Sequence, residues 1–191
     1  SIVESYSGKN ASPVTITAAG LKTGTFFANS FFTSALTGYS TTTNRFTAFG
    51  IQDKGETYGT SYGQMTLDAL TGWPMDVIVG KSYTSNHYNS YGTVDSQTSH
   101  GYSQSKINTG TPTVPVYSDT VTSVWSTTSS EFDASGTLTD SIVESYSGKN
   151  TLPKTITDAS LKTGTFFANS FFASALTGYS TTTNHFTAFG I

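Results

Sequence analysis

Hydrophobic residues in this chain come in short runs that alternate with polar residues. In Ser141–Tyr146, for example, Ile142, Glu144 and Tyr146 share one face of an extended segment. Short runs rich in β-branched and aromatic residues, bounded by Gly, Asn, Asp or Ser, predict strands. The expected strands span residues 2–6, 14–17, 25–27, 31–35, 45–49, 58–62, 75–79, 114–117, 120–125 and 137–143, together with the second copies of the early ones.

One segment, residues 26–36, leaves two interpretations open. The spacing of four residues between Phe27, Phe31 and Ala35 fits one face of a helix. A hairpin of two short strands is favoured over it, because Ser and Thr compete with the helical backbone for hydrogen bonds. In either form, we expect the core of each repeat to contain Phe26, Phe27, Phe31, Phe32, Phe46 and Phe132.

An internal duplication dominates the sequence. Residues 1–10 recur unchanged at 141–150, and residues 21–51 recur at 161–191 with two changes, Thr33 to Ala173 and Arg45 to His185. Over the 51 overlapping positions 44 are identical, with a constant offset of 140. We therefore expect residues 1–140 to be one full period and residues 141–191 to begin the next. Both ends are expected to be cut from a longer tandem array.

A weaker period lies inside the long one. Three segments share an aromatic residue, three further residues and then Gly: 46–50, 88–92 and 132–136. This recurrence predicts a strand–turn–strand unit repeated along the chain. We thus expect an all-β fold of tandem strand–turn–strand repeats that form an elongated β-sandwich or a β-solenoid-like unit.

The composition narrows the classes of protein. Ser and Thr together account for 64 of 191 residues, charged residues for 11%, and Cys is absent. Without Cys, disulfide scaffolds, thiolate zinc sites and iron–sulfur clusters are excluded. The net charge of −3 and the lack of a basic cluster argue against a nucleic-acid binder. No apolar run is long enough for a membrane-spanning helix.

Catalytic motifs are weak, so we expect no enzymatic activity. Gly59–Gly63 fits the Gly-x-Ser-x-Gly elbow around Ser61, but the flanking strand and helix that the elbow needs are not indicated. The glutamates available for a glycosidase pair are Glu4, Glu56, Glu131 and Glu144, and no paired motif contains any of them. Asp76 or Asp95, followed by His100, keeps the chain order of a serine hydrolase after Ser61. A third histidine, His185, replaces Arg45 at the equivalent repeat position, so that position requires neither residue.

Cofactors are not expected either. The turn aspartates Asp53, Asp95 and Asp133 each lie within a few residues of Gly, where calcium is the alternative to simple turn capping. Repeated Thr-x-Thr pairs suit the wet side of a strand better than an ice-binding surface, because their spacing is irregular.

Aromatic residues offer the main alternative surface. Sugar rings stack on exposed aromatics, while cross-strand pairing within a sheet is the favoured interpretation. The candidate glycan or partner contacts are Tyr58, Tyr62, Trp73, Tyr83, Tyr88, Tyr91 and Tyr102.

Two resemblances bear on function. The segment Phe132-Asp-Ala-Ser-Gly-Thr-Leu-Thr139 resembles the core of the YD repeats of Rhs-type bacterial surface and toxin proteins, in which strand–turn–strand units coil into a β shell. The whole chain resembles tandem arrays of bacterial cell-surface adhesins and extracellular fibres, which are Ser/Thr/Gly-rich, Cys-free and duplicated at domain-sized periods. These resemblances imply an extracellular or cell-surface location.

We therefore expect a non-catalytic structural repeat unit of a long fibre or adhesin. Its partners would be copies of itself or tandem neighbours, which it contacts through β-sheet and aromatic surfaces. A glycan-binding adhesive module is the alternative, and a polysaccharide-active enzyme or serine hydrolase is the third interpretation.

Overall fold

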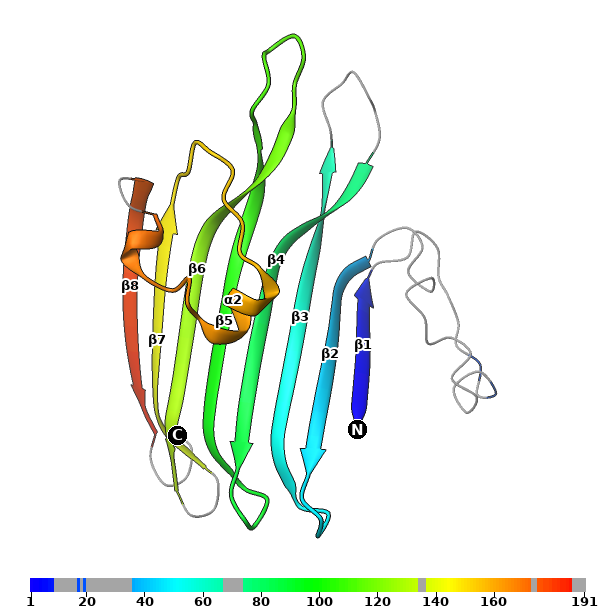
Figure 1. Cartoon of the computed structure of the whole chain (residues 1–191), viewed down its shortest axis with the longest axis vertical. Coiled ribbons are helices and arrows are strands. Elements are labelled where there is room, and N and C mark those ends of the chain that lie inside the picture. The colour runs from blue at the N-terminus through cyan, green and yellow to red at the C-terminus, as the bar shows by residue number, and fades with distance from the viewer. Residues whose placement is uncertain are drawn as a thin grey trace.

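In the computed structural model, the chain forms one open antiparallel β-sheet with a short crossing segment packed on one face (Figure 1). The structure describes residues 1–8, 17, 19, 36–66, 74–133, 137–172 and 175–186. Phe26, Phe27, Phe31, Phe32 and Trp73, predicted as core or contact residues, lie outside this part of the chain.

Within the described residues, eight strands follow one another in sheet order as they do in sequence. They are β1 (Ile2–Gly8), β2 (Leu36–Phe46), β3 (Gln52–Thr66), β4 (Pro74–Tyr88), β5 (Val94–Asn108), β6 (Tyr117–Phe132), β7 (Leu138–Gly148) and β8 (Leu176–His185). The prediction of an all-β chain is confirmed. The described strands form a single open sheet, however, and not the expected sandwich or solenoid, because each strand pairs only with its neighbours in sequence.

The aromatic–Gly recurrence marks the hairpin turns at one end of the sheet. In the β2–β3 turn, the Thr47 amide donates to the Ile51 carbonyl at 2.8 Å, and Gly50 has φ 78°. The β4–β5 turn repeats this geometry: the Asn89 amide donates to the Thr93 carbonyl at 2.9 Å, and Gly92 has φ 78°. Glycine is preferred at both positions, because a positive φ is costly for other residues.

The β6–β7 turn closes in the same way. The Asp133 amide donates to the Thr137 carbonyl at 2.9 Å, and the Asp133 carboxylate accepts from the Thr137 amide at 2.8 Å. Asp133 thus caps its own turn. Phe46 and Phe132 precede these turns at the end of the sheet, and Phe46 is 47% exposed, so it lies outside the core.

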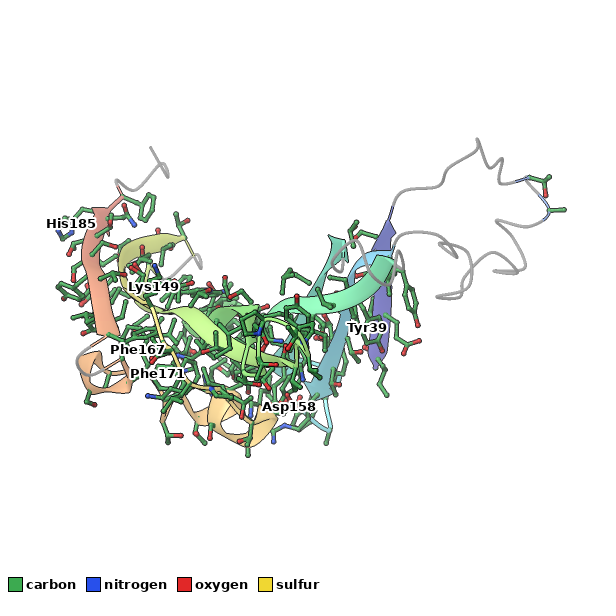
Figure 2. The ribbon with its side chains drawn as sticks, turned by 90° about the horizontal axis from the view of Figure 1, so that it is seen from above. Tyr39, Lys149, Asp158, Phe167, Phe171 and His185 are labelled. Carbon is green, nitrogen blue, oxygen red and sulfur yellow. The ribbon has the colours of Figure 1, made fainter. Side chains whose placement is uncertain are left out.

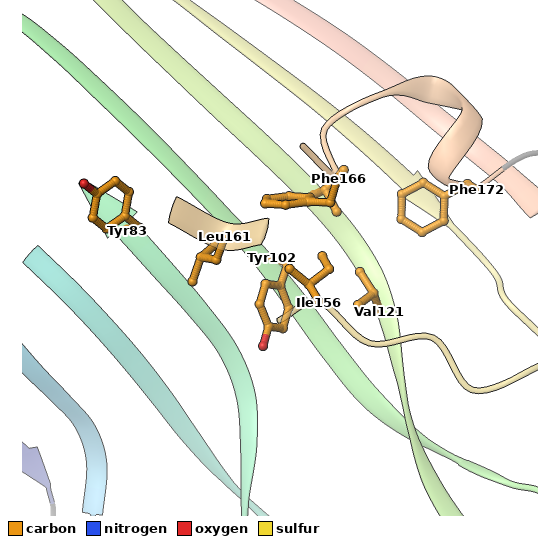
Figure 3. Packing of buried hydrophobic residues seen from close by; sticks show 8 residues of the cluster. Tyr83, Tyr102, Val121, Ile156, Leu161, Phe166 and Phe172 are labelled. Carbon is orange, nitrogen blue, oxygen red and sulfur yellow. The ribbon is translucent and has the colours of Figure 1, made fainter. Parts of the chain in front are cut away.

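The core lies between the middle strands and residues 149–172, which we call the cover segment. Tyr83, Tyr102, Val121 and Val124 project from β4, β5 and β6. From the cover segment, Ile156, Leu161, Phe166 and Phe172 pack against them (Figure 3). Leu161 and Phe172 are 1% and 2% exposed, so this small cluster holds the segment on the sheet.

The cover segment corrects three strand predictions. We expected second copies of early strands at residues 154–157, 165–167 and 171–175, but the described residues from 154 to 172 form no strand and instead contain helix α2 (Asp158–Thr163) and the 3₁₀ turn η2 (Asn169–Phe171). Thr157 caps α2 by accepting from the Ser160 amide, and Gly164 ends it with φ 66°. These caps let the segment turn back repeatedly and point its apolar side chains at the sheet.

Candidate assembly surfaces

The register of the sheet repeats with the sequence. Ile2 pairs with Thr43 and Ser5 with Ser40 in the β1–β2 hairpin, while Ile142 pairs with Thr183 and Ser145 with Ser180 in β7–β8. Every pairing of β1 with β2 recurs between β7 and β8 with both residue numbers raised by 140. The duplicated sequence therefore builds the same hairpin twice, six strands apart in one sheet.

Side-chain contacts repeat as well. The Ser5 and Ser40 hydroxyls lie 2.7 Å apart, as do those of Ser145 and Ser180. The Tyr6 and Tyr39 ring centroids are 4.9 Å apart, and those of Tyr146 and Tyr179 are 4.8 Å apart. Tyr39 donates to Glu4 at 2.9 Å, and its counterpart Tyr179 donates to Glu144 at 3.2 Å. The sequence indicated the duplication but not that both copies would join one sheet.

Two strands of the sheet, β1 and β8, have a neighbour on one side only among the described residues. Ser1 and Asn44 exchange two backbone hydrogen bonds, each 2.8 Å, so Asn44 points its backbone groups toward β1. Because these directions alternate along an antiparallel strand, Thr41 and Thr43 point theirs toward β3. By the same register, Thr181 and Thr183 direct backbone groups to the outer edge of β8. Such an edge can accept a further strand.

The cover segment ties residues of the second period to strands of the first (Figures 1 and 2). Lys162 contacts Glu56 of β3 at 2.8 Å, and Asp158 contacts Lys81 of β4 at 2.7 Å. These two ion pairs border the apolar cluster beneath α2. Lys162 belongs to the cover segment and Lys81 to the sheet, so each side of the contact contributes one cation and one carboxylate.

Glu56 lies at the centre of a small polar network. Hydrogen bonds from Lys162 and from Tyr83, the latter 2.5 Å long, lower the pKa of Glu56 from 4.5 to about 2. Burial and the same hydrogen bond raise the pKa of Tyr83 to about 12. At neutral pH, Glu56 is therefore ionised and Tyr83 keeps its proton, which it donates to Glu56.

His100 lies beneath the cover segment on β5. It contacts Ser126 at 3.1 Å, and its ring meets the Phe166 ring edge-on with centroids 6.4 Å apart. Burial lowers the pKa of His100, which favours the neutral imidazole. A Cβ at Gly164 would come within 2.7 Å of this ring, so glycine lets the α2 terminus close over it.

The weak catalytic motifs do not assemble. Register alternation places Ser61 on the face opposite His100, and Ser61 lies inside β3, whose strand continues to Thr66 where the elbow would need a helix. Glu56 and Glu131 lie on β3 and β6, with two strands between them. Asp53 pairs with Arg45 at 2.9 Å and Asp95 with His87 at 2.6 Å. No cluster of three metal-ligating side chains occurs among the described residues.

The tyrosines predicted as a contact surface separate into different environments. Tyr83 and Tyr102 are 4% and 5% exposed and belong to the core, whereas Tyr91 is 89% exposed in a turn. The Tyr58 ring contacts the Tyr83 ring at a tilt of 49°, with centroids 4.8 Å apart. Tyr62 and Tyr88 are half-buried, at opposite ends of the sheet. They do not form one continuous platform.

The opposite face of the sheet carries small polar side chains. We call this face the open face, because the cover segment packs on the opposite face of the sheet. The open-face residues are those that alternate with Tyr83, Tyr102 and Val124 along β4, β5 and β6. Hydroxyl pairs span neighbouring strands there: Thr42–Thr57 at 2.9 Å and Thr84–Ser99 at 2.7 Å, besides the serine pairs above. The Thr-x-Thr pairs in the sequence predicted a solvent-facing side of the strands, and on the open face the hydroxyls named above hydrogen-bond between neighbouring strands.

Within the described part of the chain, no helix is long and apolar enough to cross a membrane. Comparison with known proteins finds no matching family model, curated protein or solved structure.

Proposed function

We propose that this chain is a non-catalytic structural repeat unit of a long extracellular or cell-surface fibre, in which successive 140-residue periods continue a single β-sheet. The observation that carries the proposal is the common register of the β1–β2 and β7–β8 hairpins. A sheet that returns to the same strand, in the same direction and register, after one period can be extended by the next.

The next strand to join would have a defined sequence. The inner neighbour of β2 is β3, with Thr42 opposite Thr57 and Thr41 opposite Tyr58. Because β8 is the second copy of β2, its outer edge matches a second copy of β3 with the same pairings. Each period contributes six strands, so the array would lengthen by about 29 Å per 140 residues at the usual strand spacing.

The cover segment supports this arrangement. Its apolar residues belong to the second period, and the tyrosines and valines beneath them belong to the first. A period cut after residue 140 would leave Tyr102, Val121 and Val124 without this partner. Each unit then depends on its neighbour, as in other repeat arrays.

The surface chemistry suits packing between tandem neighbours. Charged residues are 11% of the chain and the open face is built from hydroxyls, so neighbouring units would meet without strong repulsion. The resemblance in composition to extracellular fibres and adhesins points the same way. The absence of Cys also makes engineered disulfides a clean test.

The test uses a two-period chain, in which a second copy of residues 52–140 follows residue 191. We introduce Thr182→Cys together with the Thr57→Cys change in the second period. Thr42 and Thr57 form a non-hydrogen-bonded pair whose short Cα separation suits a disulfide. We expect this disulfide to form under mild oxidation, as detected by peptide mapping.

Two matched variants control the result. Thr42→Cys with Thr57→Cys in the first period tests the same geometry inside one period and is expected to form. Thr182→Cys with Ser61→Cys of the second period lies on the same face but four residues out of register, and is expected not to form. If the first-period pair forms and the Thr182 pair does not, the continuous sheet is refuted.

A further inference from the structure

Beyond its structural role, we propose that the open face binds a sugar ring of a neutral glycan in a hollow beside Trp125. This site differs from the tyrosines considered above and does not depend on how periods join. The face-sharing residues fixed by register include Ser, Thr, Gly, Asn and Gln, and Trp125 is the open-face aromatic residue that lines this hollow. Tryptophan is the aromatic side chain with the largest flat surface for stacking.

Gly101 on β5 positions the indole. It stands directly opposite Trp125, and a Cβ built on it would lie 2.3–2.5 Å from three adjacent atoms of the indole ring. The indole therefore lies across the backbone at Gly101, with one ring face against the sheet. This geometry fixes the ring without burying it fully, since Trp125 is only partly buried.

A hollow of about 260 Å³ adjoins the indole. Its lining includes Trp125, Ser61, Ser82 and Ser103, and Gly80 forms part of it. A second hollow of about 250 Å³ shares Ser61 and Ser82 and reaches toward β1, so the two form a shallow trough across several strands. An elongated trough fits a chain of sugars better than a compact small molecule.

Glycine leaves Ser61 and Ser82 of this trough without a hydroxyl opposite them on the neighbouring strands. Ser61 stands between Gly38 and Gly80, and Ser82 between Gly59 and Gly101. Elsewhere on the open face, hydroxyls of neighbouring strands bond to one another, as in Thr84–Ser99. Among the described residues, the Ser61, Ser82 and Ser103 hydroxyls have no side-chain partner of this kind.

These features together match the chemistry of a pyranose. Its axial C–H groups form an apolar patch that stacks on an aromatic ring, while its equatorial hydroxyls donate and accept at the rim. In the trough, the fixed indole of Trp125 can stack on the C–H groups, and the Ser61 and Ser82 hydroxyls can bond to the sugar hydroxyls. Gly38, Gly59 and Gly80 keep the neighbouring strands free of side chains beside Ser61 and Ser82.

The test is titration of this chain with cellohexaose, chitohexaose and mannohexaose, followed by calorimetry and by tryptophan fluorescence. Trp73→Phe as background leaves Trp125 as the only indole. We expect saturable binding of at least one oligosaccharide with a change in Trp125 emission. Binding by none of the three overturns the proposal.

Four variants locate the site. Trp125→Ala and Gly101→Ala, which displaces the indole without removing it, are each expected to weaken binding at least tenfold. Tyr91→Ala, at an exposed tyrosine in the β4–β5 turn, is expected to leave binding unchanged. Trp125→Phe keeps an aromatic ring and is expected to weaken binding less than Trp125→Ala. Circular dichroism checks that each variant is folded. Equal loss in Tyr91→Ala, or unchanged affinity in Trp125→Ala, refutes the site.

Discussion

Leu161 provides the most direct test of the cover segment. It is 1% exposed, lies in α2 and packs over the tyrosines and valines of the middle strands. Replacing a fully buried leucine by alanine removes transfer energy and leaves a cavity, at a typical cost of 2–5 kcal/mol. We expect Leu161→Ala to lower the free energy of unfolding by about 3 kcal/mol.

For a chain of this size, that loss corresponds to a fall in Tm of roughly 6–12 °C. Leu152 in the same segment is the matched control, because it is 74% exposed. We expect Leu152→Ala to change stability by less than about 0.5 kcal/mol. Both variants are measured by thermal and urea unfolding, with trypsin digestion to follow release of the segment at Lys154 and Lys162.

The outcome separates a structural clasp from a loosely attached loop. If the segment opens locally, Leu161→Ala will be cleaved faster by trypsin even where global unfolding changes less. If Leu161→Ala matches Leu152→Ala in both stability and cleavage, the segment does not hold the sheet, and our account of the core is wrong.

Three further predictions follow from the same contacts. Because the folded-state pKa of Glu56 is lowered from 4.5 to about 2, its stabilisation is present above pH 4.5 and is lost as pH falls toward 2; Glu56→Gln should flatten urea midpoints over this range, and an unchanged slope would contradict the network. A Cβ on Gly148 would lie 2.1 Å from the Phe172 ring, so Gly148→Ala should lower the free energy of unfolding in urea by about 1–3 kcal/mol. Gly178→Ala is the matched control and should cost less, because its Cβ meets only the movable Ser147 hydroxyl, at 2.7 Å. A fragment of residues 1–140 leaves the outer edge of β6 open to β1 of another copy and should associate end to end in sedimentation experiments, with suppression by a peptide of residues 141–191; a monomeric fragment as stable as the whole chain would argue against interdependent periods.

The sequence was informative where turns demand particular residues. The aromatic–Gly recurrence indicated the β2–β3 and β4–β5 turns, where Gly50 and Gly92 adopt a positive φ, but the strand expected at residues 45–49 was wrong beyond Phe46, where β2 ends. It was less informative about strand length. We expected a strand at residues 58–62, yet β3 runs from Gln52 to Thr66, since Gly and Ser on the open face hide the usual alternation.

The assembly surfaces were harder to foresee for a different reason. Thr157 and Gly164 are ordinary cap residues, but a six-residue helix in a Thr-rich segment gives little periodicity to detect. Whether the duplicated hairpins share a sheet depends on pairings between distant residues, which local patterns do not encode. The free hydroxyls beside Trp125 likewise follow from which residues face Gly across strands.

Each period of the proposed array contributes an even number of strands, six. With six strands per period, every period starts in the same direction, so neighbouring units are related by a screw translation and not by alternation. All aromatic–Gly turns would then line one long border of the strip, and all cover segments would lie on one side. A strip with unlike sides has a front, a back and a polarity along its length, so it can offer one chemistry to its surroundings and keep the other turned inward.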